Sequence, residues 1–127
     1  MDSQIKKILI VEDDKLLQRI LSEEFQKNNF LVSLASNGAE GLDKALYEKP
    51  NLILLDIVMP VMDGLTMLKN LRAEKEGAKI PVMILTNLSG PEAIEKGIQS
   101  GTFDFLVKAN WELGDIVKKV RERLGVN

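Results

Sequence analysis

Short, mostly apolar runs separated by longer amphipathic stretches constrain the fold of this 127-residue chain more than any other feature. Five such runs occur: Ile8–Val11, Phe30–Ala35, Leu52–Leu55, Val82–Leu85 and Phe103–Val107. Apolar runs of this length that alternate with helical patterns are typical of parallel strands covered on both faces. The pattern therefore predicts one α/β domain with five parallel strands and five helices, spanning residues 1–127.

Capping residues between the runs predict where the helices begin. The expected N-caps are Asp14, Asn37, Ser89 and Asn110, and a turn at Asp63-Gly64 precedes the third helix. The first helix should carry its apolar face on Leu16, Leu17, Ile20, Leu21 and Phe25. The fourth helix is expected to end at Gly101 and to have its apolar stripe on Ile94 and Ile98. Gly97 inside it should weaken it by about 1 kcal/mol relative to alanine.

Composition excludes several classes of function. The net charge of −2 gives no basic surface for nucleic acid, and we expect no direct nucleic-acid binding. The chain has no cysteine and no histidine, so it has no imidazole for general-base catalysis or for metal ligation. No apolar run is long enough to insert into a membrane, and we expect a cytoplasmic protein.

Polar side chains that suit phosphate chemistry follow four of the predicted strands. Glu12-Asp13-Asp14 follows the first, Asp56 the third, Thr86 the fourth and Lys108 the fifth. Taken singly, each is more often a turn, capping or solvated residue. In an open parallel sheet, however, the carboxyl ends of the strands form the ligand site. The sequence thus predicts that these groups converge.

A convergent acidic cluster needs positive charge to offset its repulsion. Two carboxylates ~5 Å apart repel by ~3 kcal/mol at an effective dielectric near 20. Oxygen ligands without His or Cys favour a hard cation, for which Mg²⁺ is the default. Lys108 would supply a second, fixed charge. The carboxylate at the centre, Asp56, could then act as a nucleophile toward a phosphoryl group.

The chain resembles the receiver domain of two-component response regulators over essentially its whole length. The resemblance rests on Val11-Glu12-Asp13-Asp14, on Asp56-Ile57-Val58-Met59-Pro60 with Asp63-Gly64, on Leu85-Thr86, and on Phe105-Leu106-Val107-Lys108. It implies a doubly wound, flavodoxin-like sheet of order 2-1-3-4-5, for which flavodoxin and a chemotaxis member of this family are the usual examples. One departure is Ala109, which stands where the family usually has a proline after its lysine.

The resemblance also implies a role for each site residue. Asp56 would be the phosphoacceptor, and Thr86 and Lys108 would contact the phosphoryl oxygens. Asp13 and Asp56 would bind Mg²⁺ directly, Glu12 through water, and Val58 through its backbone carbonyl. Phe105 occupies the position of the family's rotating aromatic switch. The phosphoryl donor would be a sensor histidine kinase or a phosphotransfer protein.

The leading interpretation is therefore a phosphorylation-controlled switch rather than a turnover enzyme. No output domain is expected after the last helix, so the signal would pass to a downstream protein through the fourth helix, fifth strand and fifth helix. A phosphatase of the haloacid dehalogenase type would need an acid at Val58. A flavodoxin-like cofactor binder would need a phosphate loop where Glu12-Asp13-Asp14 stands. A degenerate receiver that acts only as an interaction module remains the alternative.

Overall fold

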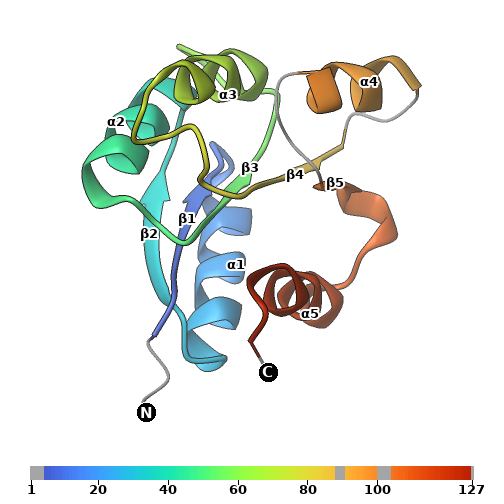
Figure 1. Ribbon diagram of the computed structural model, residues 1–127. Helices are drawn as coiled ribbons and strands as arrows, with labels where there is room; N and C mark the ends of the chain where they lie inside the picture. Colours follow the sequence, from blue (N-terminus) through green and yellow to red (C-terminus); the bar gives the residue numbers. More distant parts are fainter. Residues whose placement is uncertain (1–4, 88–90, 100–103, 127) are drawn as a thin grey trace.

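The computed structural model describes residues 5–87, 91–99 and 104–126, and within them five parallel strands form a single sheet (Figure 1). The strands are β1 (Lys7–Val11), β2 (Leu31–Ala35), β3 (Leu52–Leu55), β4 (Val82–Thr86) and β5 (Asp104–Val107). Their order in the sheet is β2-β1-β3-β4-β5. The predicted fold class, a doubly wound five-stranded parallel sheet, is confirmed.

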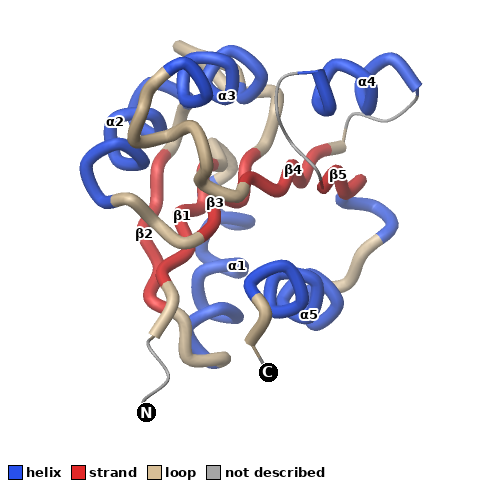
Figure 2. The backbone as a smooth tube through the Cα atoms, in the orientation of Figure 1, coloured by secondary structure: helices blue, strands red, loops and turns tan. Residues whose placement is uncertain are grey.

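In the described residues, five α-helices cover the two faces of this sheet. They are α1 (Lys15–Lys27), α2 (Gly38–Glu48), α3 (Gly64–Ala73), α4 (Pro91–Gln99) and α5 (Leu113–Leu124). Helices α2, α3 and α4 lie on one side, and α1 and α5 lie on the other (Figures 1 and 2). Within the described part of the chain, no helix has the length and apolar character needed to cross a membrane.

Each face of the sheet has its own hydrophobic core, because alternate side chains of a strand point to opposite faces. On β1, Leu9 and Val11 pack toward α2 and α3, whereas Ile8 and Ile10 pack toward α1 and α5. Burial on both faces explains why the strands are apolar runs rather than alternating sequences. It also leaves the strand ends as the place where polar side chains gather.

Helix α1 begins where the sequence predicts but buries a different set of residues. Asp14 is the N-cap, and its carboxylate accepts hydrogen bonds from the Leu16 and Leu17 amides at 3.0 and 3.2 Å. Leu16 is 59% exposed, so its predicted place on the apolar face is wrong. The buried positions of α1 are Gln18, Leu21, Ser22 and Phe25. Two of these four are polar, which hydrophobic periodicity could not reveal.

The connection between β5 and α5 also differs from the prediction. Lys108–Asn110 form a short 3₁₀ helix, so Asn110 is not the N-cap of α5. The N-cap is Glu112, whose side chain makes no capping hydrogen bond. The Lys108–Ala109 peptide bond is trans. This turn ends the strand and places Lys108 beside the carboxyl ends of its neighbours.

The prediction for α4 is tested only in part. Ser89, Gly101 and Phe103 lie outside the described residues, as does the side chain of Ile94. Ile98 is 60% exposed, so this member of the predicted apolar stripe does not pack into the core. Among the α4 positions whose burial the structure describes, Gly97 is the one that packs inward, against Phe105 of β5 and Ile84 of β4.

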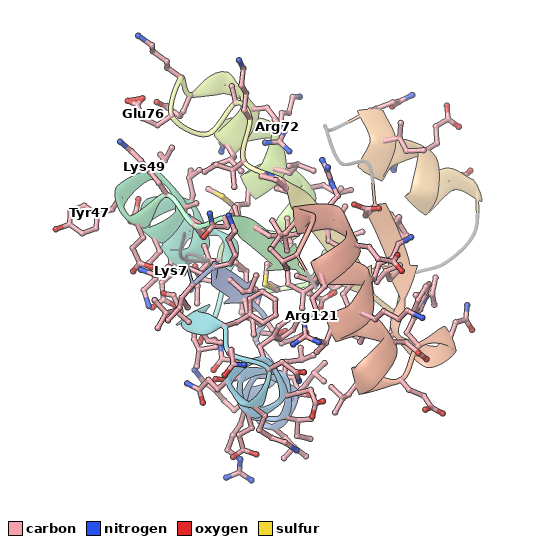
Figure 3. The ribbon with its side chains drawn as sticks, turned by 60° about the horizontal axis from the view of Figure 1, so that its bottom comes forward. Lys7, Tyr47, Lys49, Arg72, Glu76 and Arg121 are labelled. Atoms are coloured by element: carbon pink, nitrogen blue, oxygen red, sulfur yellow. The ribbon has the colours of Figure 1, made fainter. Side chains whose placement is uncertain are left out.

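At the end of the sheet opposite the carboxyl ends of the strands, Arg121 connects α5 to α1. Its guanidinium donates to the carbonyl oxygen of Asn28 at 3.1 Å and lies 6.0 Å from the centre of the Phe30 ring. Figure 3 views the molecule from this side and shows Arg121 between α5 and α1, with Tyr47 pointing away from the molecule. Helices α1 and α5 are thus connected at a distance from the candidate site.

Candidate functional site

Three carboxylates meet at the carboxyl ends of β1 and β3. Glu12 and Asp13 follow β1, and Asp56 follows β3, which is hydrogen-bonded to β1. One oxygen from each lies within 4.8 Å of the other two. Glu12 and Asp56 are buried, whereas Asp13 is exposed. For these three carboxylates, the convergence expected from the sequence is therefore present.

Lys108 bridges the two buried carboxylates. Its ammonium lies 2.8 Å from Glu12 Oε1 and 3.0 Å from Asp56 Oδ2, and donates a hydrogen bond to each. The residues are 96 and 52 positions apart from it in the sequence, so only the sheet order brings them together. The Lys108 side chain is 16% exposed, which shields these ion pairs from bulk water.

Burial and neighbouring charges shift the pKa values of Glu12 and Lys108. Burial raises the pKa of the Glu12 carboxyl, and the charge of Asp56 adds to that effect, while hydrogen bonds from Lys108 and from the Asp14 amide oppose it. Burial lowers the pKa of the Lys108 ammonium, but its hydrogen bonds to Glu12 and Asp56 and their charges outweigh burial and raise that pKa above 10.5. The site therefore holds Lys108 firmly charged and disfavours the ionised form of Glu12.

Backbone contacts fix the orientation of Asp56. The amide of Ile57 donates to Asp56 Oδ1 at 2.7 Å, which leaves Oδ2 for Lys108. Gly64 begins α3 and donates its amide to the Ile57 carbonyl at 2.8 Å. A Cβ at position 64 would lie only 2.0 Å from the Asp56 carbonyl oxygen. Position 64 therefore requires a glycine, because the start of α3 packs directly against the backbone of Asp56.

The remaining predicted site residues lie on β4, on β5 and in the loop after β3. Thr86 is buried at the end of β4, in register with Val107, the residue before Lys108. Phe105 is half-buried on β5 beside Gly97. Val58 is 60% exposed in the loop after β3. These positions agree with one site at the sheet edge, and the roles implied for the three residues stay predictions.

The donor set of the cluster fits a hard divalent cation. Glu12, Asp13 and Asp56 provide carboxylate oxygens only, the ligand type that Mg²⁺ prefers, and they lie close enough to share one ion. Lys108 already neutralises part of the charge of Glu12 and Asp56. Asp13, the exposed member, is the carboxylate most open to an ion arriving from solvent.

Sequence reasoning missed one residue that contacts the site, Gln18 of α1. Its side-chain amide donates to the backbone carbonyls of Glu12 and Ala35, at 3.0 and 3.1 Å. The available signal was a glutamine spaced three and seven residues before Leu21 and Phe25, on the buried side of the helix. A polar residue at such a position requires a buried partner.

The family model of the response regulator receiver domain matches residues 8–121, nearly the whole chain. One curated relative is a protein-glutamate methylesterase/protein-glutamine glutaminase from Syntrophomonas wolfei, 33% identical over 123 residues, covering 94% of this chain and 34% of the relative. The chain spans no more than about half the length of this and the other curated relatives that it resembles.

Solved structures agree with this assignment. A CheY-like receiver domain protein from Methanospirillum hungatei has a TM-score of 0.88 at 25% identity and covers 96% of this chain and 95% of its own. A chain of a CheX–CheY–BeF3–Mg²⁺ complex from Borrelia burgdorferi has a TM-score of 0.83 at 25% identity, with 93% and 88% covered.

The fold, the acidic cluster and the family match together define the class of protein: a receiver domain of two-component signal transduction, which is a signalling switch and not a turnover enzyme. This chain belongs to the response regulator receiver domain family.

Proposed function

We propose that residues 1–127 form one receiver domain that accepts a phosphoryl group on Asp56 in a reaction that depends on Mg²⁺. The carrying observation is the convergence of Glu12, Asp13, Asp56 and Lys108 at one sheet edge. Such an arrangement supplies a nucleophile, a cation site and a fixed ammonium at one end of the sheet. Family membership over residues 8–121 supports the same chemistry.

The geometry suggests how the residues of the chain divide the work. Because Ile57 holds Oδ1, Asp56 Oδ2 is the oxygen that attacks phosphorus. An O–P bond forms, the bond between phosphorus and the donor's leaving group breaks, and the leaving group keeps the electron pair. Bound Mg²⁺ would neutralise charge on the phosphoryl oxygens. Lys108, released from Asp56 Oδ2, would then pair with a phosphoryl oxygen, and Thr86 would donate to another.

These 127 residues include no histidine, so a phosphohistidine donor must lie outside them. We therefore propose a sensor histidine kinase or a phosphotransfer protein as the donor, as the family resemblance implies, in the cytoplasm. The receiver would act on a downstream protein through α4, β5 and α5, with Phe105 as the switch residue. The CheX–CheY complex that matches this fold contains both Mg²⁺ and a second protein, which supports this proposal by analogy.

Labelling with acetyl phosphate tests the proposal directly. Wild type should gain one phosphoryl group by intact-mass spectrometry in the presence of Mg²⁺ and none in EDTA, and Asp56→Asn should gain none. Asp14→Asn is the matched control, because it removes a neighbouring exposed carboxylate while keeping a good helix cap. Normal labelling of Asp56→Asn would refute the assignment. A wild type that never labels would favour the degenerate receiver.

A further inference from the structure

We propose that the side-chain amide of Gln18 positions the acidic loop Glu12–Asp14 and thereby sets the affinity of the site for Mg²⁺. The inference rests on the metal site of the proposed function and concerns a residue outside the predicted site. Gln18 makes no contact with the ion in this proposal. It acts through the backbone of Glu12.

Gln18 is a buried polar residue with an unusual pair of partners. It lies in the second turn of α1, 6% exposed, and its Nε2 donates to the carbonyl of Glu12 at 3.0 Å and to that of Ala35 at 3.1 Å. Glu12 follows β1, and Ala35 is the last residue of β2. One amide group therefore connects the first helix to the carboxyl ends of two neighbouring strands.

The two hydrogen bonds of Gln18 lie where β1 ends and the acidic loop begins. The Glu12 amide donates to the same Ala35 carbonyl at 3.0 Å, so Gln18 completes a triangle that fixes both backbone groups of Glu12. The Glu12 carboxylate is also held, by Lys108 and by the Asp14 amide at 3.0 Å. Asp13 lies between these fixed points with an exposed side chain. Its direction therefore follows from the backbone that Gln18 holds.

The direction of Asp13 matters because Mg²⁺ is strict about geometry. The ion requires near-octahedral coordination with short bonds to oxygen, so small displacements of a carboxylate weaken binding. Groups that hold a ligand in place, without touching the metal, typically change affinity by about 10- to 100-fold when they are removed. A rotation of the Glu12 carbonyl would turn the following peptide and move the Asp13 carboxylate relative to Asp56.

Gln18→Met removes the donor while keeping side-chain length and helix propensity. Ser22→Ala is the matched control, since Ser22 is the other buried polar residue on this face of α1 and is 8% exposed. Gln18→Asn is a second variant, whose shorter amide cannot reach both carbonyls. It keeps the test open if Gln18→Met does not fold. Mg²⁺ affinity of the folded proteins would be measured by calorimetric titration with MgCl₂, and stability by urea unfolding.

We expect Kd for Mg²⁺ to rise about tenfold in Gln18→Met and in Gln18→Asn, the lower end of the range for such residues, and to stay unchanged in Ser22→Ala. Folded Gln18 variants that bind Mg²⁺ as tightly as wild type, however much stability they lose, would overturn the inference alone. A wild type that does not bind Mg²⁺ would instead overturn the proposed metal site, and the inference with it.

Discussion

Replacing Gly97 with alanine should destabilise the protein, although helix propensity alone predicts the opposite. Gly97 packs against the ring of Phe105, and a Cβ there would lie 2.9 and 3.1 Å from two ring carbons and 3.3 Å from Ile84 Cδ1. Contacts below 3.0 Å between carbon atoms cannot persist, so either the ring or α4 must move. In the proposed switch, this substitution would disturb the aromatic residue of β5.

The expected magnitude follows from two opposing effects. Alanine in place of glycine inside a helix stabilises by about 1 kcal/mol. Inserting a methyl group into a packed contact costs about 1–3 kcal/mol. Gly97→Ala should therefore lower the free energy of unfolding by roughly 0–2 kcal/mol, as the balance of these two effects. The sign differs from the stabilisation that the sequence alone predicts.

Urea unfolding of wild type and variants would measure the change. Gly114→Ala in α5 is the control, because a Cβ there would meet no atom within 4 Å, and it should stabilise by up to about 1 kcal/mol. Phe105→Leu shortens the ring side chain, so the double variant with Gly97→Ala should recover stability and show coupling of about 1 kcal/mol or more. Equal stabilisation by Gly97→Ala and Gly114→Ala, without coupling to Phe105, would refute the argument.

Three further predictions concern the site. Folding raises the pKa of Lys108, so the stabilisation that its charge provides is complete below pH 10.5 and is lost as the pH rises through the higher folded value. Lys108→Met lacks this charge. In EDTA, its free energy of unfolding should therefore fall less at alkaline pH than that of wild type. An identical alkaline dependence would contradict this. Gly64→Ala should cost about 3 kcal/mol in urea unfolding, because its Cβ would lie 2.0 Å from the Asp56 carbonyl oxygen, and a loss below about 1 kcal/mol would show that the loop adapts easily. Val58→Asn should speed loss of the phosphoryl group from Asp56, since an exposed amide can orient an attacking water that valine cannot; an unchanged decay rate after labelling would argue against water positioning.

The strands and the site carboxylates could be predicted because both leave local signals. An apolar run that ends in Asp56 or in Glu12-Asp13 records burial on both faces of a strand and then a sudden change to polar residues. Asp14 and Asn37 are predictable helix caps for the same reason, because the capping hydrogen bond is made within three residues.

The errors have a different origin. The apolar pattern predicts Leu16 on the apolar face of the first helix, yet the burial of a helix position depends on what packs against it, and Leu16 is exposed. The residue type of Asn110 suits an N-cap, but the 3₁₀ turn at Lys108 delays the start of α5. In both cases a local preference was overridden by the path of the neighbouring chain.

The sequence by itself determined which residues end the strands, and so which groups can take part in the chemistry. Only the tertiary structure decided which partners those groups meet. Lys108 reaches Glu12 and Asp56 because parallel strands β1, β3, β4 and β5 lie side by side in the sheet. Gln18 is buried because two strand ends present carbonyl oxygens to it. The residue type in the sequence determines whether a side chain is polar. Its hydrogen-bond partner, however, belongs to residues far along the chain, and only folding brings the two within hydrogen-bonding distance.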